Sequence, residues 1–353
     1  MKSIKLGRKL INDNSLYFVA DIGANHNGSL EKAKELIHMV KEAGGDAAKF
    51  QNFSAKKIVS QVGFDNLKVK LSHQSKWKKK VYEVYEDASI NEEWTSILKA
   101  ECDKVGLDYF TSPYDFEAVD LVDPYVELYK IGSGDASWLE IVEYVLSKGK
   151  PTLLATGACS LDDVDRMMSL ALRKPNDIVL MQCNTNYTGD PENFKFCNLS
   201  VLKKYRELYP DTILGLSDHT AGHATVLGSI ALGARVIEKH FTDDNDQIGP
   251  DHGFAMNPKS WRDMVDRSYE LLNALGDGVK RVEPNEEQSY IVQRRCICAA
   301  SNLEKGHVIT KEDLIPLRPI GENSFHPYEW ENLVGKELKN NLVFGEHFTR
   351  DSI

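Results

Sequence analysis

The chain has 353 residues, of which 42% are hydrophobic and 27% are charged, so it can build a folded core and is not dominated by disorder. Its 53 acidic residues outnumber its 43 lysines and arginines, which argues against general nucleic-acid binding because neutralising phosphates requires a basic surface. The sequence contains no stretch near the ~20 apolar residues that span a bilayer, no apolar signal core at its N-terminus and no Cys-x-x-Cys pair. We therefore expect a cytoplasmic protein with reduced cysteines that binds neither nucleic acid nor membrane.

Eight short apolar runs alternate with amphipathic segments of helical length. The runs cover residues 17–22, 47–50, 108–110, 128–131, 152–155, 178–181, 213–216 and 236–241. The helical segments cover residues 30–43, 94–105, 138–146, 161–172, 199–208, 224–232 and 259–275. Strands that alternate with helices predict a parallel sheet, and eight such units in about 275 residues match the count and size of a (β/α)₈ TIM barrel. A doubly wound open sheet is the alternative.

The composition changes after this repeat. Residues 276–287 are polar and contain Gly276, Gly278 and Pro284, which is typical of a linker. Further on, short alternating runs and many turn residues predict a small β-rich domain. We expect a barrel at 1–278, a linker at 279–292 and the small domain at 293–353. In that domain Cys296 and Cys298 alternate with Ile297 on an expected strand, which favours packing over metal binding.

A long excursion at residues 52–90 follows the second apolar run. It carries six lysines between Lys68 and Lys80, and such a charge run is typical of a solvated helix face. A long loop at the catalytic face of a barrel is also typical of a lid over the active site.

Polar side chains follow all eight runs. In a barrel the carboxyl ends of the strands open onto one face, where active sites lie, so these groups predict a site rather than ordinary loop polarity. His219 and His240 end the seventh and eighth runs and are 21 residues apart, the length of one repeat. Because neighbouring strands are ~4.8 Å apart, the two imidazoles could share a metal ion, while two structural histidines are the alternative. With oxygen atoms as further ligands, manganese, zinc, iron and cobalt all suit such a site.

Two lysines also lie on the predicted strands. A lysine buried in a barrel requires an anion or a lowered pKa, and this applies to both Lys49 and Lys130. Together with nearby hydroxyl groups they predict a pocket for a phosphate or a carboxylate. The hydroxyl groups belong to Ser112, Ser133 and Ser217. Two alternatives remain, namely ion pairs with Asp21, Asp135 or Glu238, and a Schiff-base role for one of the lysines.

Taken together, these motifs resemble the sialic acid (N-acetylneuraminate) synthase family of phosphoenolpyruvate-dependent enzymes. The matching stretches are Asp-Ile-Gly-Ala-Asn-His-Asn-Gly-Ser at 21–29, Lys-Phe-Gln at 49–51, Tyr-Lys-Ile-Gly-Ser-Gly-Asp at 129–135, Gly-Leu-Ser-Asp-His-Thr at 215–220, Glu-Lys-His-Phe-Thr at 238–242 and Gly-Pro-Asp-His at 249–252. The C-terminal part resembles the small SAF, or antifreeze-protein-like, domain of that family at residues 303–306, 314–319 and 333–336. The resemblance implies a TIM barrel followed by a SAF domain.

The resemblance also implies a reaction. Carbon three of phosphoenolpyruvate attacks the aldehyde of an open-chain sugar, either N-acetylmannosamine or a diacetamido-dideoxy hexose. Water adds to carbon two, phosphate leaves, and a nine-carbon 2-keto-3-deoxy acid of the sialic, legionaminic or pseudaminic type is released. In that family a divalent metal ion, usually Mn²⁺ with Mg²⁺ or Co²⁺ as alternatives, is held by histidines that match His219 and His240.

The resemblance assigns roles to further residues. Those that match the phosphate and carboxylate site are Lys49, Lys130, Ser112, Ser133 and Ser217, and those near the sugar and the metal-bound water are Gln51, Tyr187 and Asp251. Arg318 matches an arginine that one subunit lends to the sugar site of its partner, which implies a domain-swapped homodimer. The family usually has glutamate where this chain has the catalytic candidates Asp21 and Asp135, and each aspartate is one methylene shorter.

Two further stretches depart from the pattern of the family. At Ala155-Thr156-Gly157 the family often has a serine in the first position, so one phosphate contact is either lost or taken over by Thr156. The loop at 183–187 resembles the corresponding loop of the family, but its asparagines are shifted by one position relative to that loop. The alternative functions are a Schiff-base aldolase on the same barrel and a carbohydrate-binding homologue that has lost catalysis.

Overall fold

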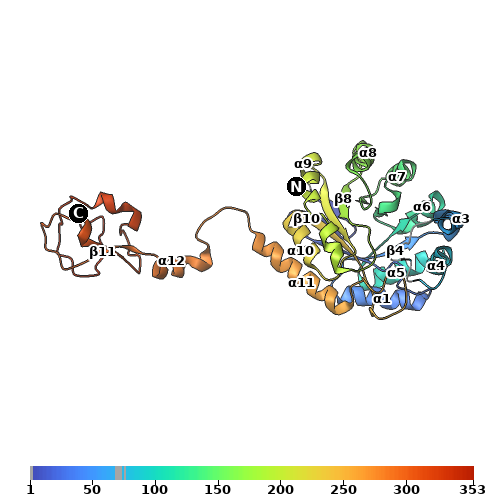
Figure 1. Cartoon of the computed structure of the whole chain (residues 1–353), viewed down its shortest axis with the longest axis horizontal. Coiled ribbons are helices and arrows are strands. Elements are labelled where there is room, and N and C mark those ends of the chain that lie inside the picture. Colours follow the sequence, from blue (N-terminus) through green and yellow to red (C-terminus); the bar gives the residue numbers. More distant parts are fainter. Residues whose placement is uncertain (1–2, 68–73, 75–76) are drawn as a thin grey trace. The chain divides into compact units, whose positions relative to one another are not determined.

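The computed structural model describes residues 3–67, 74 and 77–353 and divides the chain into two compact units (Figure 1). The first unit is Met1–Gly276 and the second is Asp277–Ile353. Each unit has its own hydrophobic core and is described by itself. Among the described residues, no helix combines the length and the apolar character that a membrane crossing requires.

The first unit is built on an eight-stranded parallel sheet. Its strands are β3 (Tyr17–Asp21), β4 (Ala47–Asn52), β5 (Asp108–Pro113), β6 (Tyr129–Ile131), β7 (Thr152–Ala155), β8 (Ile178–Cys183), β9 (Ile213–Asp218) and β10 (Ala234–His240). Their order is β5-β4-β3-β10-β9-β8-β7-β6, and β5 and β6, at the two ends of this order, lie next to each other. The sheet therefore curls into a barrel, which confirms the predicted TIM fold and excludes the open sheet.

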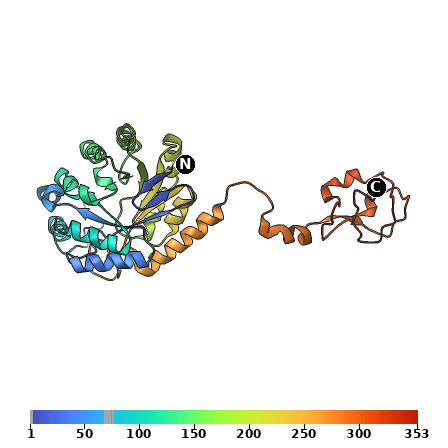
Figure 2. The same cartoon turned by 180° about the vertical axis from the view of Figure 1, so that it is seen from behind.

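Helices surround the strands on the outside (Figure 1). The main ones are α1 (Leu30–Glu42), α5 (Trp94–Val105), α6 (Phe116–Val122), α7 (Leu139–Ser147), α8 (Leu161–Ala171), α9 (Val201–Leu208), α10 (Ala224–Ala231) and α11 (Pro258–Leu275). Shorter elements are α2 (Ala55–Ile58), α3 (Gln61–Asp65) and α4 (Val81–Ala88), with short 3₁₀ helices η2 (Asp123–Tyr125), η3 (Ser133–Asp135) and η4 (Pro191–Phe196). The last helix of the ring, α11, contacts the first, α1, and both views show them side by side (Figures 1 and 2).

An N-terminal hairpin, which the sequence did not predict, precedes the barrel. It consists of β1 (Ile4–Leu6) and β2 (Lys9–Ile11), and the side chains of Ile4, Leu6 and Ile11 are buried in the barrel core. The turn at Gly7 has φ +51°, and an added Cβ there would lie 2.0 Å from the Asp108 carboxylate. That carboxylate accepts hydrogen bonds from the backbone N–H of Arg8, at 3.0 Å, and from the hydroxyl of Tyr17, at 2.7 Å. Because Tyr17 and Asp108 begin their strands, the hairpin closes the end of the barrel opposite the strand carboxyl ends.

The second unit is small and β-rich, as predicted. Its only regular sheet among the described residues is the antiparallel pair β11 (Cys296–Ala299) and β12 (Leu314–Leu317). Its core is formed by Ile297, Ala299, Leu303, Ile309, Phe325, Leu333, Leu338, Leu342 and Phe348. Helix α12 (Glu287–Gln293) and the turn η5 (Pro284–Glu286) lie in the range expected to be a linker, and the turns η6 (Lys311–Asp313) and η7 (Pro327–Asn332) lie further on.

Tyr17→Phe should lower the free energy of unfolding by about 1.5–3 kcal/mol, because the buried carboxylate of Asp108 loses a hydrogen bond at 2.7 Å. Urea unfolding of the full chain, followed by circular dichroism, measures this loss. The matched control is Tyr125→Phe, since the Tyr125 hydroxyl makes no hydrogen bond among the described residues. Equal stability of the two variants would contradict a role for Asp108 in holding the hairpin to the barrel.

Candidate active site

A cavity of about 460 Å³ opens at the carboxyl ends of the barrel strands. Twelve of the thirteen predicted site residues line it. They are Asp21, Lys49, Gln51, Ser112, Lys130, Ser133, Asp135, Tyr187, Ser217, His219, His240 and Asp251. Sheet register explains much of this convergence, because Asp21 pairs with both Lys49 and His240 on its neighbouring strands.

The thirteenth residue, Arg318, lies in the second unit. It directly follows β12, it is exposed, and its peptide bond to Pro319 is cis. Among the described residues, its guanidinium makes no hydrogen bond and no ion pair. It therefore presents an uncompensated positive charge on the surface of that unit.

Two lysines and two carboxylates form a buried network in the cavity, the lysine–carboxylate network of Lys49, Lys130, Asp21 and Glu238. Lys49 Nζ donates to Asp21 Oδ2 at 2.5 Å and lies 3.5 Å from Glu238 Oε1. Lys130 Nζ donates to Glu238 Oε1 at 2.6 Å and lies 3.5 Å from Ser217 Oγ. The four side chains are 3–6% exposed. Two of the three predicted lysine partners are therefore present, and Asp135 is not one of them.

The groups of this network shift one another's pKa values in different directions. Burial by itself raises the pKa of Asp21, but the ammonium of Lys49 and then His240 outweigh burial and lower the pKa to about 2. Burial also opposes ionisation of Glu238, and Lys130 and Lys49 hold its pKa below the ordinary value. For Lys130, burial dominates and lowers the pKa, because Glu238 offsets it only in part and Lys49 adds repulsion. An anion in the cavity would therefore stabilise the charge of Lys130 most.

Asp135 lies in a different environment, on the turn η3 that follows β6. Burial raises the pKa of its carboxyl group to about 6. No ion pair within the described ranges compensates that carboxylate. The site thus contains two carboxyl groups that stay ionised, Asp21 and Glu238, and one, Asp135, that holds its proton towards neutral pH. Such a difference in pKa is typical of acid–base chemistry.

The two histidines lie together, with ring centroids 5.4 Å apart. His219 Nδ1 is 3.0 Å from the carbonyl oxygen of Asn184, so this nitrogen carries the proton and Nε2 keeps its lone pair. His240 Nδ1 is buried without a hydrogen-bond partner among the described residues and lies 3.5 Å from Asp251 Oδ2. Its Nε2 is 3.6 Å from Asp21 Oδ2. These donor types fit a divalent metal ion.

Aromatic rings hold the imidazoles in place. The ring of Tyr187 lies 4.4 Å from His219, and the ring of Phe254 lies 5.0 Å from His240. Both contacts are edge-on. Packing therefore fixes the orientation of both imidazoles, and a hydrogen bond to Asn184 also holds His219.

The excursion that follows β4 contributes a wall of the cavity. Phe53, Trp77 and Tyr85 line it, which agrees with the expectation of a cover over the strand ends. Half of the lysine run, at 68, 70 and 76, lies outside the described residues. Sequence reasoning missed these aromatic residues because no local pattern distinguishes them from ordinary core residues.

Glu238 and Gly157 were not singled out as site residues either. Glu238 had a signal, since it shares a strand face with His240. Gly157 donates its N–H to Ser133 Oγ at 2.9 Å, and an added Cβ would lie 1.8 Å from Thr185 Oγ1. The suggestion that Thr156 takes over a phosphate contact is wrong, because its hydroxyl donates to the carbonyl of Met181 and is 4% exposed.

Two family models match this chain, one over most of the barrel and one over the small C-terminal domain. A model of the NeuB family matches residues 36–280, and a model of the SAF domain matches residues 294–353. The chain belongs to the NeuB family. It is 32% identical to the N,N'-diacetyllegionaminic acid synthase of Legionella pneumophila, over 93% of this chain and 92% of that protein. It is 29% identical to a pseudaminic acid synthase of Campylobacter jejuni, over 95% of both chains.

A solved structure supports the NeuB-family fold. The N-acetylneuraminic acid synthetase of Leptospira borgpetersenii matches with a TM-score of 0.71 and 24% identity, covering 82% of this chain and 95% of that one. The two family models and the relatives confirm the resemblance inferred from the strand-end motifs. The NeuB-family relatives are acid synthases, and the chain is an enzyme of this condensing type.

Asp135→Asn should stabilise the protein increasingly as the pH rises. A folded-state pKa of about 6, above the ordinary 3.8, means that ionising Asp135 costs stability, and this cost grows from pH 3.8 to pH 6. The variant's advantage in the free energy of unfolding should grow by about 1 kcal/mol between about pH 5 and pH 7.5, and reach at most about 3 kcal/mol. Urea unfolding at both pH values measures it, with the exposed Asp211→Asn as the control. A difference that does not change with pH would show that Asp135 is not held protonated.

Proposed function

We propose that this NeuB-family enzyme condenses phosphoenolpyruvate with an open-chain N-acylhexosamine-type sugar, giving a nine-carbon 2-keto-3-deoxy acid and phosphate. The acceptor is N-acetylmannosamine or a diacetamido-dideoxy hexose, and the product is of the sialic, legionaminic or pseudaminic type. The supporting observation is one cavity that combines two buried lysines, a carboxyl group of raised pKa and a pair of histidines.

The phosphoenolpyruvate end of the cavity is the part near Lys130. Ser112 Oγ is buried there without a hydrogen-bond partner among the described residues, so it is free to donate to a ligand oxygen. Lys130 is the cation that gains most from an anion, and Ser217 lies beside it. A phosphate or carboxylate in this position would complete the hydrogen bonds of both groups.

The metal end of the cavity is the part near His219 and His240. Within the described ranges of the barrel, no three His, Cys, Asp or Glu side chains have ligand atoms within 4.8 Å of one another, so a metal ion would take further ligands from water or substrate. We propose Mn²⁺, with Mg²⁺ or Co²⁺ as substitutes. When bound, such an ion polarises the sugar aldehyde and favours attack by carbon three.

The chain's own groups divide the proton transfers. Asp135 keeps a proton towards neutral pH and can donate it to the aldehyde oxygen as the carbon–carbon bond forms. Asp21 and Asp251 lie on either side of His240 and can orient the water that adds to carbon two. A second cavity of about 1090 Å³ shares Trp77 and Tyr187 with the first and gives room for the sugar chain.

A Schiff-base aldolase is the second candidate, and one observation favours it. Burial lowers the pKa of Lys130, which increases its fraction of neutral amine. Against it, Lys130 Nζ donates to Glu238 at 2.6 Å, and this ion pair keeps it protonated. Borohydride in the presence of sugar substrate separates the two, since only a Schiff base would be trapped covalently.

Phosphate release from phosphoenolpyruvate should occur only with an acceptor sugar and a divalent ion such as Mn²⁺. The assay screens open-chain hexosamines and diacetamido-dideoxy hexoses, with chelator as the negative control. His219→Ala and His240→Ala should each lower turnover about 1000-fold or more and reduce bound metal, because ligands at neighbouring strand ends cannot be replaced by water without loss of geometry. His38→Ala, outside the cavity on α1, is the matched control. Metal-independent turnover, or full activity of either cavity variant, would remove this assignment.

We also propose that Arg318 acts in the sugar site of a partner subunit, so that the enzyme is a domain-swapped homodimer. Support comes from its exposed guanidinium, which is uncompensated among the described residues. Arg318→Ala and His219→Ala should both be inactive alone. After subunit exchange, a mixture should recover about a quarter of wild-type activity, because half the dimers are mixed and each has one intact site. An inactive mixture, with heterodimers demonstrated by mass spectrometry, would show that Arg318 does not act in trans.

A further inference from the structure

Strand β11 of the second unit carries two cysteines on one face. Cys296 and Cys298 are both fully buried, and their sulfur atoms are 3.9 Å apart. Ile297 between them points to the other side, where it belongs to the hydrophobic core of this unit. The thiols are not part of that core cluster. Packing into the core, which the alternation favoured, therefore accounts for Ile297 and not for the cysteines.

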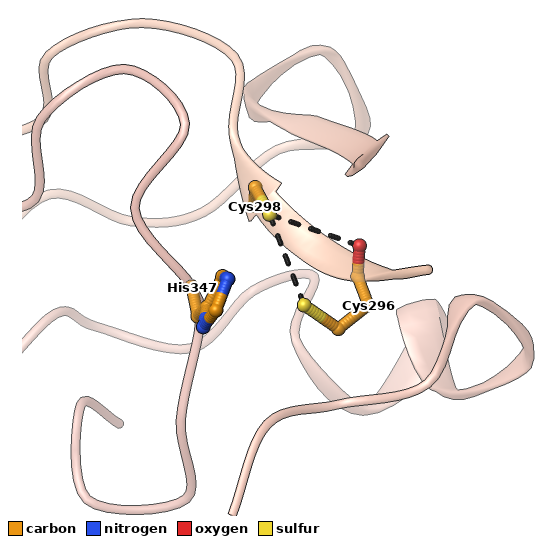
Figure 3. Close-up of side chains that lie close together, drawn as sticks. All are labelled: Cys296, Cys298 and His347. Carbon is orange, nitrogen blue, oxygen red and sulfur yellow. Dashed lines mark hydrogen bonds between the residues drawn. The ribbon is translucent and has the colours of Figure 1, made fainter. Parts of the chain in front are cut away.

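A histidine distant in sequence completes the cluster. His347 forms an antiparallel bridge with Cys298, and the Phe348 N–H donates to the carbonyl of Ile297 at 3.0 Å. The imidazole therefore lies on the same face as the thiols (Figure 3). One donor atom from each of the three residues lies within 4.8 Å of the other two.

The surroundings hold the imidazole while leaving its nitrogens available. An added Cβ on Gly321 would lie 2.0 Å from His347 Nδ1, so only glycine permits this approach of backbone and ring. Within the part of the chain that the structure describes, the His347 side chain makes no hydrogen bond and no ion pair. Its ring is half-buried, so the cluster can be reached from solvent.

We propose that Cys296, Cys298 and His347 bind one thiophilic divalent ion of the Zn²⁺ class. Two thiolates and one imidazole are a ligand set that zinc takes in proteins with the fourth position open to water. Tetrahedral bonds of about 2.3 Å place two sulfur atoms about 3.8 Å apart, close to the spacing found here. This site lies entirely in the second unit and is independent of the histidine pair in the barrel.

A disulfide is the main chemical alternative for the cysteines. Residues two apart on a strand have Cα atoms about 6.6 Å apart, at the upper limit for a disulfide, so a bond would distort β11. A metal ion needs no such distortion. It would also link β11 to a segment 49 residues further on, which stabilises a unit with a small core.

The test uses the reduced, metal-free full-length chain with Co²⁺ and Zn²⁺ as probes. Co²⁺ should produce thiolate-to-metal charge-transfer absorption, and Zn²⁺ should abolish it by displacement. Cys298→Ser removes one of the two thiolates, so it should strongly reduce the absorption and weaken Zn²⁺ binding about 100-fold or more. His347→Ala, at a half-buried position, is the second variant and should weaken binding in the same direction even if Cys298→Ser does not fold.

The controls separate this site from the barrel. Cys183→Ser and His219→Ala remove one sulfur and one nitrogen donor near the first cavity and should leave the charge-transfer absorption unchanged. Cys102→Ser controls for loss of a buried cysteine. The proposal fails if Co²⁺ gives no thiolate absorption or if Cys298→Ser leaves that absorption at full intensity. It also fails if mass spectrometry shows that the protein purified without reductant has lost two hydrogen atoms to a Cys296–Cys298 disulfide.

Discussion

The burial of four charges inside one barrel is the constraint on which the site depends. The two negative and two positive charges of this network balance. Each ion pair offsets the free energy that is lost when its two charged groups are removed from water, which for an unpaired charge would be strongly destabilising. Removing one partner of a buried pair typically costs about 3–5 kcal/mol, whereas apolar side chains of similar volume would be at least as stable. The network is therefore better explained by binding and catalysis than by stability. It also requires that the strands keep their register, because a shift of one residue would move each charge to the other face.

The same network determines how the remaining carboxyl groups behave. Asp21 ionises readily because Lys49 lies against it, while Asp135, buried without such a partner, holds its proton to about pH 6. At both positions the resemblance led us to expect glutamate, which is one methylene longer. Even so, Asp21 reaches Lys49 at 2.5 Å and Gln51 at 3.1 Å. The Asp21 carboxylate is thus held by two side chains of β4.

The two units differ in the size of their hydrophobic cores. The barrel has a large core. The N-terminal hairpin, at the end opposite the strand carboxyl ends, adds apolar side chains to this core, and a hydrogen bond to the Asp108 carboxylate holds the hairpin there. The second unit has a core of only nine buried residues within the described part and few regular ladders. A small core of this kind benefits from a cross-link between segments distant in sequence. The cluster of Cys296, Cys298 and His347 lies where such a link would act.

The amino-acid sequence by itself determined the eight strands and most of the cavity. Runs of buried apolar residues at a regular repeat identify parallel strands. Because the carboxyl ends of such strands meet at one face of a barrel, the sequence alone is enough to predict that His219 and Lys49 share one site. Only the tertiary structure decided the rest. The hairpin strands have three residues each, too few for a periodic signal, and Tyr85 reaches the cavity from the short helix α4 in the excursion after β4. Thr156 is held by a carbonyl on the next strand, and His347 meets Cys298 only through folding of the second unit. Such contacts join residues far apart in the chain, and local periodicity carries no information about them.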